Sequence, residues 1–142
     1  MSADDPARFL PHGGRMRLIE RVESWDESQI VCLADNHRAP DHPLRGAGGL
    51  AAVHAVEYAA QATAVHGGLV GGAEPGLRYV AAIRDAALAV DRLDDLPAPL
   101  RIEARHAAGN DAAVVYACEV TSGGFPVAAV RLTLVAVRGI PS

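Results

Sequence analysis

Between Arg45 and Glu74 the chain carries one formally charged residue, Glu57, inside a segment that is rich in alanine. The sequence predicts a helix over residues 49–66, which ends at the glycine pair 67–68. Small alanine side chains cover much of this helix, and that composition suits a helix packed on several sides. The remaining elements of the fold must therefore surround it.

Three polar residues, His54, Glu57 and Gln61, lie at helical spacing on one face of this helix. An ionised carboxylate in an apolar setting is costly unless it has a partner or a chemical task. Glu57 is therefore the first candidate for catalysis. The alternative is a buried ion pair with an arginine such as Arg84 or Arg131.

Alternation of apolar and polar residues predicts strands on both sides of the helix. The expected strands cover residues 16–25, 29–34, 77–83, 86–90, 100–107, 112–121 and 125–138. Residues 36–49 have the prolines and glycines of a loop, and Ser122, Gly123 and Gly124 predict a hairpin turn. This order predicts an α+β fold, with an antiparallel sheet wrapped around one long central helix in a single domain over residues 1–142.

Composition excludes several functions. All 13 basic residues are arginine, so no lysine can form a Schiff base, and the net charge of −4 without a basic cluster argues against a nucleic-acid partner. Cys32 and Cys118 lack metal-ligand spacing and are expected to be buried, reduced thiols, and no metal site is predicted. With neither a signal peptide nor a membrane span expected, the sequence predicts a cytoplasmic protein.

Two motifs carry a resemblance to a known family. Residues 10–12 read Leu-Pro-His and are followed by an aliphatic stretch that ends in Glu20, Arg21 and Val22, while residues 57–62 read Glu-Tyr-Ala-Ala-Gln-Ala. The chain resembles the hotdog-fold 3-hydroxyacyl-acyl-carrier-protein dehydratases, and looks most like their aryl polyene biosynthesis-type branch. The resemblance implies a single hotdog domain that forms 2-enoyl thioesters by removing water.

That reaction needs a base to remove a proton next to the carbonyl and an acid to protonate the departing hydroxyl. We hypothesise that Glu57 is the acid, as a carboxyl buried in the apolar surroundings of the helix. The family's His-Phe-Pro-Gly loop is replaced here by residues 41–49, where His42 is the nearest substitute for the base, with His54 as its rival.

Five residues are expected to bind or position the substrate. Gly48 and Gly49 would let a thioester approach the start of the helix closely, and His54 shares a face with Glu57. Tyr58 lies beside Glu57, while Gln61, one turn further on, would orient the carboxyl or line the pocket. The alternative for Gln61 is a packing amide bonded to the backbone.

The resemblance also implies the partners. No cofactor is expected, because the substrate arrives on the phosphopantetheine of an acyl carrier protein or as a coenzyme A thioester. The chain is expected to form a homodimer or higher homo-oligomer, or a heterodimer with a related hotdog subunit. Two other functions remain open: an acyl thioesterase that uses the helix carboxylate, and a non-catalytic hotdog subunit that binds acyl chains or stabilises a partner.

Overall fold

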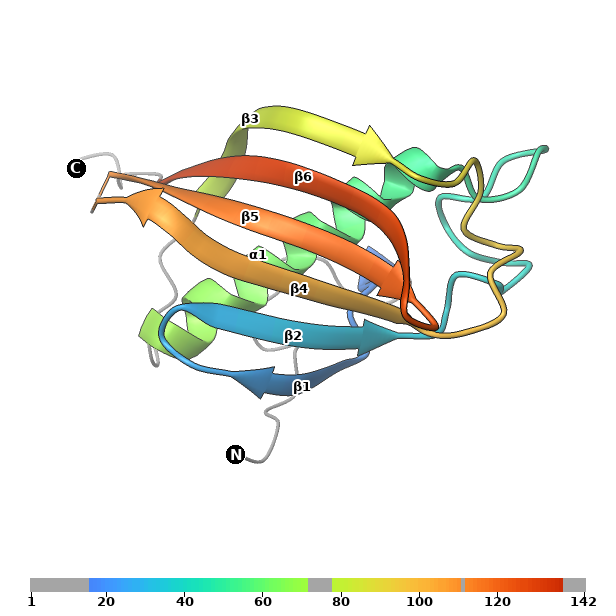
Figure 1. Ribbon diagram of the computed structural model, residues 1–142, viewed down its shortest axis with the longest axis horizontal. Coiled ribbons are helices and arrows are strands. Elements are labelled where there is room, and N and C mark those ends of the chain that lie inside the picture. Colours follow the sequence, from blue (N-terminus) through green and yellow to red (C-terminus); the bar gives the residue numbers. More distant parts are fainter. Residues whose placement is uncertain (1–15, 72–77, 111, 137–142) are drawn as a thin grey trace, which may run out of the picture.

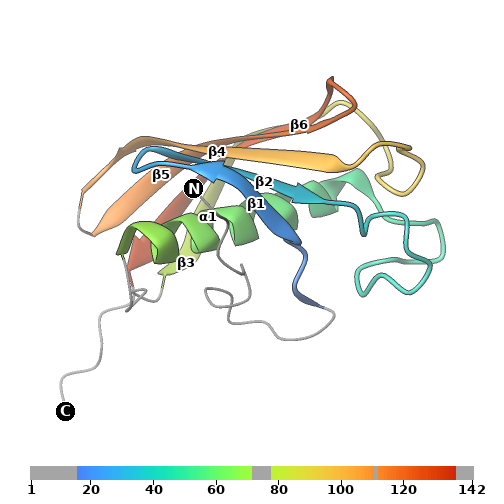
Figure 2. The same cartoon turned by 90° about the horizontal axis from the view of Figure 1, so that it is seen from below.

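A curved antiparallel sheet and one long helix form the two layers of the protein. The computed structural model describes residues 16–71, 78–110 and 112–136, and Figures 1 and 2 show the sheet covering one side of the helix. The elements are β1 (Arg21–Trp25), β2 (Gln29–Ala34), the short 3-10 helix η3 (Ala52–His54), α1 (Ala55–Gly71), β3 (Arg78–Leu88), β4 (Leu100–Gly109), β5 (Ala113–Ser122) and β6 (Phe125–Ala136).

The six strands lie in the order β1-β2-β4-β5-β6-β3. All neighbouring strands are antiparallel, so β3 hydrogen-bonds with β6 and forms one edge of the sheet, while β1 forms the other. Helix α1 follows β2 in the chain and packs against β2, β4, β5 and β6. The α+β arrangement predicted from the sequence, a sheet around one central helix, is confirmed.

The core lies between α1 and the concave face of the sheet. Tyr58, Ala59, Ala62 and Val65 are fully buried along the helix. The strands supply every second residue, as the alternating burial of β5 shows. The alanines let the backbone of the helix lie close to the sheet, so the alanine-rich composition is a packing requirement.

Several predicted boundaries were wrong. The α-helix begins at Ala55 after η3 and continues through the glycine pair to Gly71, because the buried Gly68 and Leu69 gain packing that outweighs the helix cost of glycine. The predicted strands 77–83 and 86–90 are one strand, β3, which has a bulge at Asp85 where φ is +53°. The first strand begins at Arg21 instead of residue 16.

The predicted hairpin at residues 122–124 is confirmed. Gly123 and Gly124 have φ values of +59° and +84°, which glycine adopts readily, and they join β5 to β6. In the part of the chain that the structure describes, no helix is long and apolar enough to cross a membrane.

Both cysteines are buried on strands, as the sequence predicts. Burial raises the pKa of the Cys32 and Cys118 thiols to about 12. Since the thiolate is the reactive form, we expect the native protein at pH 8 to react with a thiol reagent at least about 100-fold more slowly than the unfolded chain. Labelling followed by mass spectrometry measures this, and equal rates in the two states would contradict the burial.

Candidate active site at the start of the central helix

Glu57 lies in the first turn of α1, where a negative charge interacts favourably with the helix dipole. Its side chain is exposed in this chain, so the expectation that the helix buries this carboxyl is wrong for the isolated subunit. Within the described residues it forms no ion pair, and Arg131 is paired with Asp85 instead. The predicted alternative, a buried ion pair, is therefore not observed.

Apolar side chains flank Glu57 on the helix. Val53, one turn earlier, is 54% exposed, and Val56 is half-buried. His54 is also half-buried and lies in η3, three residues before Glu57. The carboxylate thus projects from an apolar surface that the described residues leave uncovered.

Tyr58 points the other way, into the core, where it joins a buried network with His42 and Asn36. The Tyr58 hydroxyl donates a hydrogen bond to Asn36 Oδ1, and Asn36 Nδ2 donates to the Leu18 carbonyl at 2.9 Å. His42 Nε2 lies 3.0 Å from the Tyr58 oxygen. Burial, together with the negative charge of Glu20, raises the pKa of Tyr58, so the phenol stays neutral and able to donate.

The hydrogen bonds of this network assign the tautomer of His42. The backbone N–H of Leu44 donates to His42 Nδ1 at 3.1 Å, so this nitrogen carries a lone pair. The Tyr58 hydroxyl donates its hydrogen bond to Asn36, so the Tyr58 oxygen accepts one from His42 Nε2–H. The network therefore fits a neutral imidazole that is buried and bonded at both ring nitrogens.

Gln61 ties the helix to the segment before β1. Its Oε1 accepts from the Leu18 backbone N–H at 2.7 Å, and its Nε2 donates to the Met16 carbonyl, also at 2.7 Å. The side chain is 5% exposed. Both the oxygen and the nitrogen of the Gln61 amide therefore hydrogen-bond with the backbone. This is the arrangement that was expected from the sequence as the alternative to a role beside the substrate.

Gly49 and Gly48 differ sharply in their surroundings. Gly49 has a φ of +100°, and a Cβ built there would lie 2.6 Å from a carboxylate oxygen of Asp94 and 2.8 Å from a guanidinium nitrogen of Arg92. Asp94 accepts from the Leu50 N–H at 3.0 Å and from Arg92 Nε at 3.1 Å. These hydrogen bonds hold the pKa of Asp94 well below its usual range. Gly48, by contrast, is exposed and has nothing within 4 Å of such a Cβ.

The contrast between the two glycines gives a matched test. Gly49→Ala is expected to lower the free energy of unfolding by about 2 kcal/mol or more, because the left-handed conformation strains alanine and the new methyl group must displace Asp94. Gly48→Ala is expected to change it by less than about 0.5 kcal/mol. Urea titration of the two variants measures the difference, and equal stabilities would contradict this account of the helix start.

Sequence reasoning missed Asn36 and Asp94. Asn36 reaches Tyr58 and Leu18 across long stretches of sequence, and no local pattern marks it. Asp94 lies in the acidic loop 91–95 and had one available signal, a charged cluster between two strands. The roles of Glu57, His42, Gly48, Gly49, His54, Tyr58 and Gln61 toward a substrate stay predictions.

Comparisons with known proteins show which family and which fold this chain resembles. The sequence profile of the ApeP-like family, described as ApeP dehydratase, matches residues 4–139. No curated protein sequence matches at a significant level. Among solved structures, the dehydratase heterocomplex ApeI:P from Xenorhabdus doucetiae has a TM-score of 0.82 and 21% identity, over 95% of this chain and 92% of that chain.

Two other structures share the fold more distantly. A protein from Helicobacter felis gives a TM-score of 0.69 at 10% identity, covering 97% of this chain and 90% of that one. A hypothetical thioesterase with coenzyme A from Streptococcus pneumoniae gives 0.60 at 12% identity, covering 82% and 84%. At these identities the solved structures establish the hotdog fold alone. The family profile spans nearly the whole sequence, and the chain belongs to the ApeP-like dehydratase family.

Proposed function

We propose that this chain is a hotdog subunit that dehydrates 3-hydroxyacyl thioesters to 2-enoyl thioesters, with Glu57 as the general acid. The observation that carries the proposal is the position of Glu57, an exposed carboxyl in the first turn of the central helix among apolar neighbours. An apolar cover over such a group favours its protonated form, which is the form that can give a proton to a departing hydroxyl.

The dehydration also needs a base opposite Glu57. His42 is buried and bonded at both ring nitrogens, so in this arrangement it orients the Tyr58 network instead of facing open solvent. We therefore place the base on a second hotdog subunit that packs over Glu57. His54, half-buried one turn before Glu57, is the candidate base within this chain.

An uncovered apolar strip beside the helix supports a second subunit. Val80, Ile83 and Leu88 on the edge strand β3 pair with β6 residues that face the helix, yet Ile83 is 55% exposed and the other two are also exposed. Directly opposite residues share one face of a sheet. The strip, together with the edge of β3 that pairs with no described strand, would therefore be covered by the strand and helix of a partner.

The partner is a second copy of this chain or a related hotdog subunit, as in the ApeI:P heterocomplex. The substrate is carried on the phosphopantetheine of an acyl carrier protein or on coenzyme A, with no further cofactor. We place the reaction in the cytoplasm, in fatty acid or polyketide-type biosynthesis, with aryl polyenes as the products that the family suggests.

A turnover assay tests the proposal. The purified chain, alone and mixed with a hotdog dehydratase subunit encoded in the same genome, is incubated with a 3-hydroxyacyl thioester and with its 2-enoyl counterpart. Water loss, hydration and free thiol are followed together. Interconversion without thiol release supports the proposal.

Two results would overturn it. Release of thiol would identify a thioesterase, in which the helix carboxylate attacks the thioester or activates water. If neither the chain nor the mixture shows any reaction beyond that of the second subunit alone, the chain is a binding or stabilising subunit.

A further inference from the structure

The convex face of the sheet, turned away from α1, carries two pairs of like charges. Arg84 on β3 lies directly opposite Arg131 on β6, and Glu103 on β4 lies directly opposite Glu119 on β5. Like charges at directly opposite positions on neighbouring strands are unfavourable. Neither pair of like charges stabilises the fold of a solvated monomer.

The described residues neutralise these charges unevenly. Glu103 has two arginines of its own strand beside it, Arg101 at 3.3 Å and Arg105 at 3.6 Å. Arg131 Nε, by contrast, lies 3.8 Å from an oxygen of Asp85, whose side chain is 78% exposed. No ion pair or hydrogen bond to Glu119 occurs in the part of the chain that the structure describes. Glu119 and the weakly paired Arg131 therefore remain available to a group from outside the chain.

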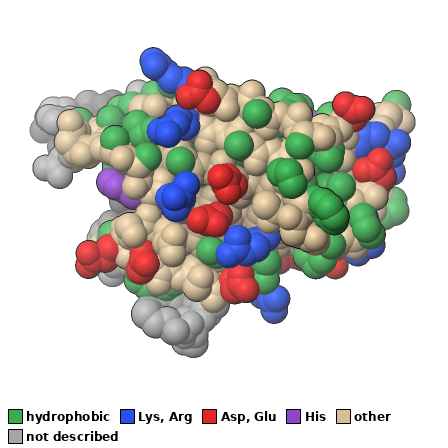
Figure 3. Space-filling model, viewed as in Figure 1, with side chains coloured by type: hydrophobic (Ala, Val, Ile, Leu, Met, Phe, Trp, Pro, Cys, Tyr) green, Lys and Arg blue, Asp and Glu red, His purple; other side chains and the backbone are tan. Residues whose placement is uncertain are grey.

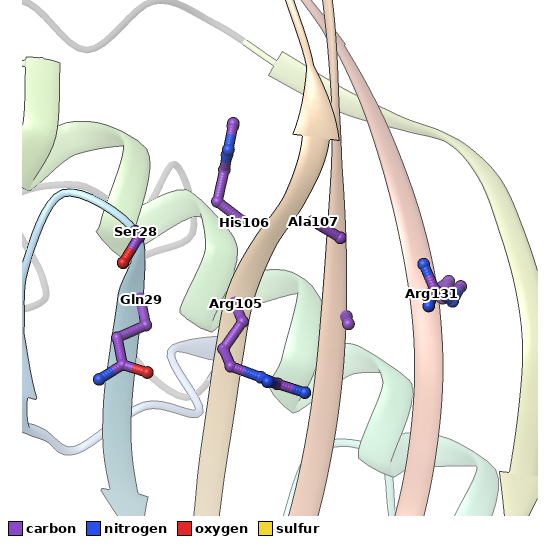
Figure 4. Close-up of a pocket in the computed structure, with 7 residues that line it drawn as sticks. Ser28, Gln29, Arg105, His106, Ala107 and Arg131 are labelled. Carbon is purple, nitrogen blue, oxygen red and sulfur yellow. The ribbon is translucent and has the colours of Figure 1, made fainter.

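Figure 4 shows a hollow between the arginines. Arg105 and Arg131 both lie opposite Ala117, whose small side chain leaves a depression of about 310 Å³ that the Arg105 side chain crosses toward β5. Among the described residues, the nearest acidic oxygens to these two guanidinium groups lie at ion-pair distances of 3.6 Å and 3.8 Å, beyond the length of a hydrogen bond. The hollow thus presents N–H donors that are only weakly engaged by the chain's own carboxylates, which fits a carboxylate or another oxyanion from outside.

The two charge pairs are arranged so that the face complements itself. The arginine pair spans β3 and β6, while the glutamate pair spans β4 and β5 about 7 Å further along the strands, at two residues' rise. Figure 3 shows acidic and basic side chains side by side in the middle of this face. A twofold axis in the plane of the contact would lay each pair on the opposite pair of a second copy.

We propose that two copies of this chain pack back to back through the convex face of the sheet, with Glu119 of each copy paired with Arg131 of the other. A purely acidic partner fits the face less well, because its charges would also meet Glu103 and Glu119. This contact lies on the face of the sheet opposite to the apolar strip of β3, and the proposal does not rest on the proposed function.

Charge reversal with exchange tests the proposal. Sedimentation velocity measures the mass of the wild type, of Arg131→Glu, of Glu119→Arg, and of an equimolar mixture of the two variants. Each single reversal is expected to weaken the contact by about 100-fold or more and to halve the mass, because like charges then face each other. The mixture is expected to regain the wild-type mass, since one half of its contact keeps the native pair and the other half has the signs exchanged.

Arg38→Glu serves as the control, because Arg38 lies in a loop away from this face and is similarly exposed. It is expected to keep the wild-type mass. Recovery in the mixture also shows that both variants are folded. The proposal is overturned if neither reversal changes the mass, or if the mixture stays at half mass. It is likewise overturned if the mass is constant while calorimetry shows inorganic phosphate binding that Arg131→Glu abolishes, because the hollow would then be a small-anion site.

Discussion

Replacing Glu57 with glutamine is expected to lower the dehydration rate at least about 100-fold, because an amide cannot give a proton to the departing hydroxyl. The amide has nearly the same shape as the carboxyl, and the side chain is exposed, so the fold and the binding of the thioester should survive. Single-turnover kinetics with the assembled dehydratase, beside a measurement of thioester affinity, separates the chemical step from binding.

The control for this experiment is Glu27→Gln, which removes an exposed carboxylate from the turn between β1 and β2. Its dehydration rate should equal that of the wild type. A Glu57→Gln enzyme with unchanged turnover would exclude Glu57 as the acid. Loss of thioester affinity with an unchanged chemical step would instead make it a binding residue.

Replacing Gln61 with leucine is expected to lower the free energy of unfolding by about 3 kcal/mol, although the size of the side chain changes little. The substitution removes both hydrogen bonds to the segment before β1. The buried Leu18 N–H is then left without its acceptor, while the Met16 carbonyl lies close enough to the surface to find water. Thermal or urea unfolding measures the loss.

Glu57→Gln provides the matched comparison for stability, because it lies one turn away on the same helix and is exposed. It should change the free energy of unfolding by less than about 0.5 kcal/mol. If Gln61→Leu is as stable as the wild type, the amide is not a structural tie, and its predicted role beside the substrate gains weight.

The architecture could be predicted because its signals are local. The uncharged alanine-rich segment predicted the central helix, and alternation with glycine turns predicted the strands around it. The errors fell where tertiary contacts outweigh local preference. Gly68 remains part of the helix because it is buried there. Strand β3 continues past Arg84 and Asp85 because a bulge accommodates these two residues.

The surroundings of the candidate acid could not be predicted. The sequence around Glu57 is apolar because the helix has two covered sides, one against the sheet and one that we assign to a partner. A single sequence does not distinguish these sides, so an exposed carboxyl was expected to be buried. The hydrogen bond between His42 and Tyr58, and the close approach of Asp94 to Gly49, depend on how distant loops meet, which no periodicity reveals.

The position of β3 in the sheet has a consequence for biosynthesis. This strand is translated before β4, β5 and β6, yet its neighbour in the sheet is β6. Until the ribosome has completed β6, the backbone of β3 and the side chain of Ile83 have no place in the folded sheet. This nascent segment is therefore where a chaperone would be needed most, and a ribosome that stalls before β6 would leave it open to aggregation.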